Sequence, residues 1–172
     1  MELTPTTPRR RSMRLTGFDY SQSGAYFITI VCQDRESWFG EIGQAVMKLN
    51  AAGRMVEEWR LELAKKFSTS EIDEFIVMPN HVHGIVWLSG EAEGLTLASV
   101  VQWFKTMTTN AYIRGVREEN WPPFREKLWQ RGYYDHILRD DRDLDNARRY
   151  IMGNLALWEQ DHENLKGLVI HP

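Results

Sequence analysis

The amino-acid sequence predicts an α+β fold, built on one antiparallel sheet with helices on one face. Short runs rich in β-branched and aromatic residues alternate with longer segments whose apolar residues recur at helical spacing. The 172 residues have the composition of a folded protein of about one domain, with 42% hydrophobic residues. With 12 glycines, 6 prolines and no stretch dominated by one residue type, the chain is neither collagen-like nor largely disordered.

The first predicted strand is the clearest element of the sequence. Residues 25–32 (AYFITIVC) form a β-branched and aromatic run bounded by polar residues, which predicts a buried strand. Residues 38–42 predict a short companion strand. Residues 49–66 then carry apolar side chains at helical spacing among charges, which predicts the first helix.

The middle of the chain predicts two neighbouring strands and a second helix. Pro79 cannot donate a hydrogen bond to a sheet, so it separates a strand at residues 74–78 from one at residues 81–88. A loop rich in glycine and charge occupies residues 89–94. Residues 95–113 then resume helical spacing and predict the second helix.

The last third predicts a loop, a strand and a third helix. Residues 114–127 include a Pro-Pro pair and predict a loop, residues 128–138 predict a strand, and residues 141–161 predict a helix. Asp140 or Asp141 is expected to cap that helix. The order strand, helix, strand, strand, helix, strand, with a helix appended, is that of the ferredoxin-like split β-α-β arrangement.

Charge, cysteine content and hydropathy restrict the class of protein. With 21 basic and 24 acidic residues, the formal charge of −3 does not favour bulk attraction to nucleic acid, so binding must rely on local patches. Cys32 is the single cysteine, which excludes an internal disulfide and fits a reducing cytoplasm. The apolar runs are strand-sized, and no apolar segment follows the N-terminal arginines, so we expect no membrane span and no secretory signal.

The N-terminal residues differ in composition from the rest of the chain. Residues 1–14 combine two prolines with four arginines that only Glu2 opposes, and they predict a flexible basic arm preceding a single domain at residues 15–172. Such an arm is either a solvated tail or a grip on phosphates. The arginines concerned are Arg9, Arg10, Arg11 and Arg14.

Two histidines flank one apolar residue in a predicted strand, as His81-Val82-His83. Because side chains alternate along a strand, both imidazoles lie on one face while Val82 points into the core. Their spacing allows both rings to reach one divalent ion. The competing interpretation is a pair of surface histidines on a half-buried strand.

The last predicted helix carries a second polar pair. Tyr150 and Asn154 stand four residues apart and therefore project from the same helix face. Taken alone, Tyr150 is expected to fill the core seam of its helix. Beside a two-histidine site, it becomes a candidate nucleophile and Asn154 a candidate third ligand, since Mg²⁺ and Mn²⁺ accept oxygen donors.

Four segments together resemble a known family. They are residues 15–21 (LTGFDYS), residues 78–83 (MPNHVH), residues 129–136 (WQRGYYDH), and Arg149-Tyr150-Ile151 with Asn154. Over most of its length the chain resembles the single-tyrosine HUH transposases, and within them the REP-associated tyrosine transposases, named after repetitive extragenic palindromes (REP). One departure is Leu155, where family members commonly have a proline, so that the helix is expected to continue where relatives turn.

The resemblance implies a function and a site. His81, His83 and Asn154 would hold a divalent metal ion, Mg²⁺ or Mn²⁺, and Tyr150 would attack a phosphodiester of single-stranded DNA. A 5′-phosphotyrosine bond would form and a 3′-hydroxyl would leave, on hairpins of the REP type. Because ligation needs neutral imidazoles, activity is expected to fall in acid. The resemblance also implies a cytoplasmic, nucleoid-associated protein with no nucleotide cofactor, and indeed no phosphate-binding glycine motif occurs.

Further residues are candidates for contact with DNA. Trp129, Tyr133 and Tyr134 can stack on unpaired bases, although alternation places one of the two tyrosines in the core. His136 is expected either near the metal and DNA or in a structural hydrogen bond. Besides the arm, the basic candidates are Lys105, Arg131, Arg148 and Arg149.

Several alternatives stay open at this level. A domesticated hairpin-binding protein would keep the fold and metal site without cleaving DNA. Another HUH endonuclease, such as a replication initiator or relaxase, fits less well because the chain is short. A ferredoxin-like RNA-binding module would leave the histidines incidental. Whether the protein is a monomer or a homodimer is not predicted.

Overall fold

The computed structural model describes residues 23–89, 94–156 and 158. The predicted basic arm at residues 1–14, with its four arginines, lies outside the described residues, as does the motif at residues 15–21. Within the described residues, no helix is both long enough and apolar enough to span a bilayer.

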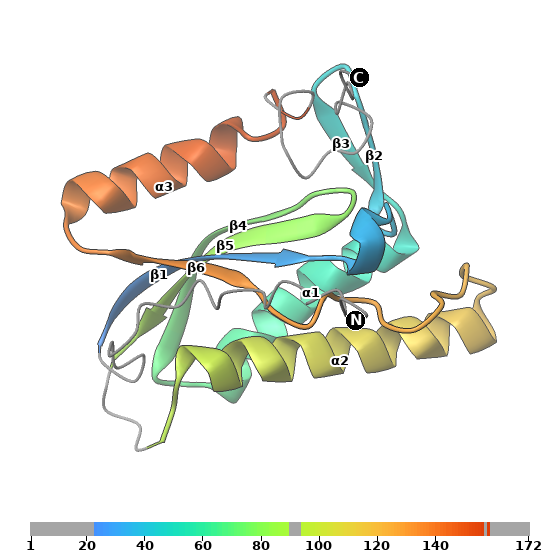
Figure 1. Ribbon diagram of the computed structural model, residues 1–172, viewed down its shortest axis with the longest axis horizontal. Helices are drawn as coiled ribbons and strands as arrows, with labels where there is room; N and C mark the ends of the chain where they lie inside the picture. The colour runs from blue at the N-terminus through green and yellow to red at the C-terminus, as the bar shows by residue number, and fades with distance from the viewer. Residues whose placement is uncertain (1–22, 90–93, 157, 159–172) are drawn as a thin grey trace, which may run out of the picture.

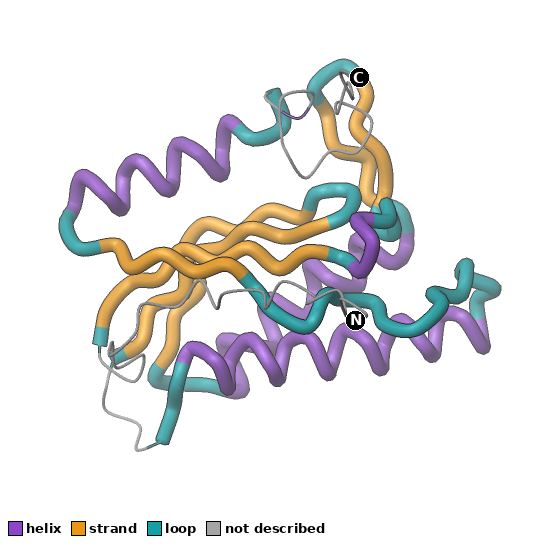
Figure 2. Tube along the Cα trace, viewed as in Figure 1, coloured by secondary structure: helices purple, strands orange, loops and turns teal. Residues whose placement is uncertain are grey.

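The central feature is a four-stranded antiparallel sheet, visible edge-on in Figures 1 and 2. Its strands stand in the order β4-β5-β1-β6, with bounds Ser70–Val77, His81–Leu88, Gly24–Val31 and Tyr134–Leu138. β5 pairs with β4 on one side and with β1 on the other, so the connection from β1 to β4 leaves one strand between them. This is the split β-α-β topology, and the predicted ferredoxin-like class is confirmed.

Helices cover both faces of the sheet, unequally. α1 (Ala51–Lys66) and α2 (Leu97–Glu118) lie side by side on one face, and α3 (Asp141–Gly153) lies alone on the other (Figure 1). Alternation along β1 divides its side chains between the two layers: Tyr26, Ile28 and Ile30 join the core under α1 and α2, whereas Ala25 joins a smaller cluster under α3. The appended helix therefore creates a second interface, which holds the site described below.

The predicted companion strand is instead one arm of a hairpin. β2 (Gly40–Gly43) and β3 (Val46–Leu49) pair only with each other and stand beside the end of the main sheet (Figure 2). The second arm was not predicted because the connecting residues Gln44 and Ala45 adopt positive φ, of 53° and 56°, without the usual glycine or asparagine signal. α1 begins after this hairpin, where the Asn50 side chain accepts a hydrogen bond from the Gly53 amide.

The second half of the chain corrects three predicted boundaries. α2 runs five residues past the predicted end at 113, to Glu118. The strand predicted at 128–138 is shorter, because only 134–138 pair continuously, while Trp129 forms an isolated bridge with Cys32. α3 begins as predicted, with Asp140 as its cap, but ends at Gly153 and is followed by a turn at residues 154–156. The expectation that Leu155 lets the helix continue is therefore wrong.

The early end of α3 has a local cause. The Asn154 amide donates to the Ile151 carbonyl and the Ala156 amide to the Gly153 carbonyl, which is the tightened three-residue bonding of a helix terminus. Gly153 weakens the helix at the same point. Residues 159–161 of the predicted helix, like residue 157, lie outside the described part of the chain.

Candidate active site

The two histidines of β5 point toward α3 and are almost completely buried. His81 is 0% and His83 3% exposed, so the interpretation as surface histidines is wrong. Alternation places Val82 in the opposite core, as predicted. In the sheet register, His83 stands opposite Thr29 of β1 and His81 opposite Val31.

The rings are oriented so that their Nε2 atoms face each other, 2.9 Å apart. The other ring nitrogens are occupied. His83 Nδ1 lies 2.8 Å from the Thr29 hydroxyl, and His81 Nδ1 lies 2.8 Å from the amide oxygen of Asn80. An amide oxygen only accepts, so His81 carries its proton on Nδ1 and directs the Nε2 lone pair at its neighbour. The two Nε2 atoms are close enough together that both could bind one divalent ion.

Asn80 is a site residue that sequence reasoning missed. Its side chain is 1% exposed, and its amide nitrogen donates to the Arg35 carbonyl at 3.1 Å, which fixes the oxygen toward His81. Its backbone carbonyl accepts from Cys32, so the whole turn before β5 is anchored to the end of β1. The Pro-Asn pair before the histidines is a turn signal, and its asparagine also orients the His81 ring.

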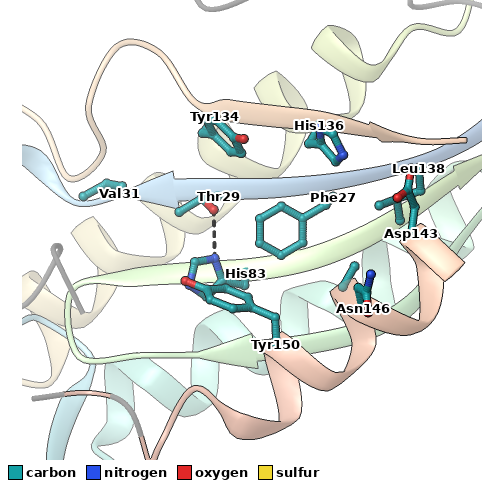
Figure 3. Close-up of a pocket in the computed structure, with 11 residues that line it drawn as sticks. Phe27, Thr29, Val31, His83, Tyr134, His136, Leu138, Asp143, Asn146 and Tyr150 are labelled. Carbon is teal, nitrogen blue, oxygen red and sulfur yellow. Dashed lines mark hydrogen bonds between the residues drawn. The ribbon is translucent and has the colours of Figure 1, made fainter. Parts of the chain in front are cut away.

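Tyr150 of α3 reaches the site from the opposite side. Its ring centroid lies 5.3 Å from that of His83 and 5.7 Å from that of Phe27. The side chain is 39% exposed, because Leu144 and Ile151 fill the core seam of the helix in its place. Figure 3 shows Tyr150 beside His83. The interpretation of Tyr150 as a residue that fills the core seam is therefore wrong.

Asn154 follows Tyr150 by four residues and is 2% exposed. Its Oδ1 atom is buried and has no hydrogen-bond partner among the described residues. Four residues further on, the Trp158 ring stacks on His81 at 6.0 Å between centroids. The segment therefore contacts His83 through Tyr150, which precedes Asn154, and His81 through Trp158, which follows it.

The donor chemistry of these three residues fits a divalent ion. In the described residues, no cluster of three His, Cys, Asp or Glu side chains exists that would form a metal site by itself. Two buried imidazole nitrogens and one unsatisfied amide oxygen supply mixed nitrogen and oxygen donors, which suit Mn²⁺ and are compatible with Mg²⁺. A buried oxygen without a partner costs stability, and a bound divalent ion would satisfy it.

α3 is fixed to the sheet by an ion pair next to Tyr150. The Arg148 guanidinium donates to Asp73 of β4 through Nη2 at 2.6 Å and Nε at 3.1 Å, and Trp87 Nε1 donates to the same carboxylate at 3.3 Å. Burial raises the pKa of Asp73, but the hydrogen bonds from Arg148 and Trp87 outweigh it and leave the pKa below its usual value. Asp73 lies between Ile72 and Phe75, where the pairing register of β4 with β5 shifts.

The other basic residues predicted to contact DNA differ in their burial and in their hydrogen-bond partners. Lys105 belongs to α2, which packs on the opposite face of the sheet from α3. Its Nζ donates to the carbonyls of residues 130, 131 and 132 at 2.6, 3.0 and 3.4 Å. Burial, and then the charge of Lys127, lowers the pKa of Lys105 to about 8. Arg131 is exposed, and Arg149 is exposed with a hydrogen bond from Nη2 to Asn146 Oδ1 at 2.6 Å. Contact of any of these side chains with DNA stays a prediction.

An open cavity of about 610 Å³ lies beside the tyrosine, between α3 and the strands β1 and β6. Tyr134 and His136 of β6 line it together with His83 and Tyr150, whereas Tyr133 packs against the opposite core. This settles which of the two adjacent tyrosines faces the site. Figure 3 shows Phe27 at the centre of the cavity, with Asp143 and Asn146 from α3 at one end.

Comparison with known proteins gives consistent relatives. Residues 22–154 match the family described as IS200-like transposases. An uncharacterized protein of Haemophilus influenzae is 35% identical over 164 residues, which are 88% of this chain and 91% of that protein. A second Haemophilus influenzae protein, named as a REP-associated tyrosine transposase, is 28% identical over 139 residues, or 79% of this chain and 72% of its own. A solved REP-associated tyrosine transposase bound to a REP hairpin has the same fold, with a TM-score of 0.60 and 21% identity over 84% of this chain and 73% of that one.

Proposed function

The chain belongs to the IS200-like transposase family, and from this premise we propose that it cleaves and rejoins single-stranded DNA through a covalent bond to Tyr150. The observation that carries the proposal is the convergence of three groups at one place. Two histidine nitrogens face each other at 2.9 Å, and the exposed Tyr150 ring lies 5.3 Å from the nearer imidazole. The proposed substrate is a single strand that folds into a REP-type hairpin.

In the proposed reaction, the Tyr150 oxygen attacks a phosphorus atom of the DNA backbone. The bond between phosphorus and the 3′-oxygen breaks, the tyrosine proton is released, and the departing 3′-oxygen takes up a proton. The product is a 5′-phosphotyrosine bond and a free 3′-hydroxyl. Attack by another 3′-hydroxyl reverses these changes and frees Tyr150, so the phosphoester bond is conserved and no nucleotide cofactor is needed.

His81, His83 and Asn154 are the proposed ligands of a divalent ion. Bound there, Mg²⁺ or Mn²⁺ would act as a Lewis acid on the non-bridging oxygens of the scissile phosphate. The protein's own contribution is orientation: Asn80 and Thr29 hold the two imidazoles in place, and the ion pair between Arg148 and Asp73 holds the helix that carries Tyr150.

The proposal that the DNA is a hairpin rests on relatives. One of the similar proteins is named as a REP-associated tyrosine transposase, and the solved structure with the same fold holds a REP hairpin. Arg149, exposed beside Tyr150, and the exposed Arg131 are the proposed phosphate contacts. A cytoplasmic protein acting at the nucleoid is part of the same proposal.

The test is covalent capture of labelled DNA. The full chain is incubated with a single-stranded REP-type hairpin from the source genome, with Mn²⁺ or with chelator, and resolved on a denaturing gel. We expect an adduct with wild type in Mn²⁺ and none with Tyr150→Phe or His83→Ala. Tyr133→Phe is the matched control, since Tyr133 precedes β6 and packs against the opposite core.

Two results would contradict the proposal. Cleavage that persists in chelator would remove the metal ion from the mechanism. Tight hairpin binding without any adduct would favour the domesticated, non-cleaving protein, which uses the same fold and site for recognition alone.

A further inference from the structure

We propose that the groove between α1 and α2 is a docking surface for the basic arm of the same chain, residues 9–14, and that this groove competes with DNA phosphates for the arm. The groove is formed by the two helices on the face of the sheet opposite α3, so it is separate from the histidines and Tyr150. Docking of the arm goes beyond the proposed function and does not depend on DNA cleavage.

The groove lies between the first three turns of α1 and the end of α2. Its lining includes the buried Ala111 and the half-buried Met55, Trp59 and Trp121. Gly115 allows the Trp121 ring to lie against α2, because a Cβ atom at this position would collide with the ring. The volume of about 560 Å³ falls within the roughly 300–1,000 Å³ of small-ligand sites, so the groove holds a few side chains and no folded partner.

The groove carries more negative than positive charge. Four carboxylates line it, against the two guanidinium groups of Arg54 and Arg114. One carboxylate, that of Glu62, pairs with a lysine of its own helix at 2.6 Å. Among the described residues, the other three carboxylates make no hydrogen bond or ion pair, and they belong to Glu58, Glu118 and Glu119. These carboxylates repel phosphate and attract a cation, so the groove favours a basic partner over DNA.

The arm has the complementary composition. Within residues 1–14, four arginines are opposed by a single acidic residue, Glu2. A guanidinium group forms paired hydrogen bonds with a carboxylate and also stacks on the face of a tryptophan ring. The groove offers both kinds of partner, since its unpaired carboxylates stand on the same two helices as the apolar lining with Trp59 and Trp121. Arginine is therefore the basic side chain that uses the whole surface.

The length of chain before β1 allows the arginines to reach the groove. Arg14 stands ten positions and Arg9 fifteen positions before Gly24, where β1 begins. An extended chain covers at most about 3.3–3.6 Å per residue, or roughly 33–54 Å for these two arginines. Gly24 pairs with Leu88, and α2 starts nine positions after that residue, at Leu97. The part of the groove that α2 forms lies about 21–33 Å along this helix, within the span of the arm.

Attachment to the same chain favours the arm over a separate basic partner. A tethered segment that can span the distance has an effective concentration at its site in the millimolar range, without any additional contact. Exposed ion pairs are individually weak, so a docked arm exchanges with the free state. A run of DNA phosphates attracts the same arginines, and we therefore expect DNA and the groove to exclude each other from the arm.

The first test is a disulfide trap in the full chain. Ser12→Cys places a thiol among the arginines, and Arg114→Cys places one in the groove while leaving every carboxylate there unchanged. Cys32 is 0% exposed and takes no part. We expect the bridge within one chain to form about fivefold faster than in the control pair Ser12→Cys with Thr106→Cys, because docking raises the local thiol concentration. Thr106 is exposed on α2, outside the groove and about two turns nearer to the start of the helix.

The second test measures the affinity of the full chain for a labelled thymidine oligonucleotide in chelator, where no metal-dependent cleavage occurs. The groove variant combines Glu58→Gln, Glu118→Gln and Glu119→Gln, and should bind about fivefold more tightly, because apparent affinity follows the fraction of chains whose arm is free. Neutralising other carboxylates also favours DNA binding, so a charge-matched control is needed. It combines three exposed positions outside the groove, Glu57→Gln, Glu71→Gln and Glu126→Gln.

The arm variant completes the comparison. It changes Arg9, Arg10, Arg11 and Arg14 to glutamine and leaves the groove intact. In this background the groove substitutions should raise affinity no more than the charge-matched control does, since no arginines remain to be released. The thiol pairs and the glutamine variants alter different residues, so each test stands if a variant of the other fails to fold.

Three results would overturn docking of the arm. The first is equally fast bridging at Arg114→Cys and Thr106→Cys. The second is a gain in affinity of the groove variant that the charge-matched control equals, or that persists in full in the arm variant. The third is a bridge that joins two chains, which would assign the groove to the arm of a second copy. Absence of cleavage in the covalent capture assay would leave all of these measurements unchanged, so the docked arm and the proposed reaction fail separately.

Discussion

Replacing Asn154 by leucine separates a structural role of this buried side chain from a role in binding metal. Its Oδ1 has no hydrogen-bond partner among the described residues, and an unsatisfied buried polar atom costs about 1–3 kcal/mol. Leucine has the same number and branching of side-chain heavy atoms as asparagine and no polar atom to bury. In chelator, we therefore expect Asn154→Leu to be more stable than wild type by about 1–2 kcal/mol, or roughly 2–8 °C in Tm for a chain of this size.

Divalent ions should reverse this order. An ion at one hundred times its Kd stabilises the folded state by about 2.7 kcal/mol. Wild type is expected to gain this amount in Mn²⁺, whereas Asn154→Leu keeps only the two imidazoles and should gain much less. Crossing of the two stabilities between chelator and Mn²⁺ is the diagnostic result.

The assay is thermal and urea unfolding of both proteins, in chelator and in a Mn²⁺ series. Asn110→Leu is the matched control, because Asn110 is exposed on α2 and the same substitution there should change stability little in either condition. Equal stabilisation of wild type and Asn154→Leu by Mn²⁺ would refute ligation by the amide. A marked loss of stability of Asn154→Leu in chelator would refute the reasoning from the unsatisfied oxygen.

Three other predictions concern the surroundings of the site. The pKa of Asp73 is lowered in the folded state from 3.8, so the stabilising effect of its carboxylate is complete above about pH 4 and is lost as the pH falls through the lowered value. The free energies of urea unfolding of wild type and Asp73→Asn should therefore differ at neutral pH and converge in acid. Arg149→Gln should reduce the slope of log affinity against log salt by about 1, whereas Lys105→Gln should leave that slope unchanged and lower stability, because its ammonium is bonded to backbone carbonyls. Gly84→Ala would place a methyl group 2.8 Å from Phe75 Cδ2 and should lower the free energy of urea unfolding by about 1–3 kcal/mol. DNA cleavage should persist, because the methyl group faces away from the histidines, and loss of cleavage by a folded variant would contradict this placement.

Much of this fold follows from periodicity in the sequence. Alternation along β5 puts both histidines on one face, and the order of strands and helices fixes the split β-α-β topology. The four-residue spacing of Tyr150 and Asn154 places them together on α3. These are local patterns, and each depends on a period that the backbone imposes.

What the sequence did not reveal depends on contacts between distant segments. α3 covers the second face of the sheet, and its Arg148 pairs with Asp73 of β4. This contact joins residues 75 positions apart in the sequence, so no local pattern predicts it. Lys105 was predicted to contact DNA because it is a basic residue on a helix, but its partners are carbonyls 25 to 27 residues away. The Gln44-Ala45 turn contains no glycine, so the sequence preferences of turns do not predict its positive φ values.

The central claim is that Tyr150 becomes covalently attached to DNA. Because Tyr150 follows Arg149, trypsin releases it as the first residue of a peptide ending at Lys166. Wild-type protein is reacted with the hairpin in Mn²⁺, digested with trypsin and nuclease, and analysed by fragmentation mass spectrometry. We expect a nucleotide phosphate on the first residue of this peptide, and the same peptide unmodified in chelator. A phosphate bond on any other residue, or DNA cleavage with this peptide wholly unmodified, would contradict the account.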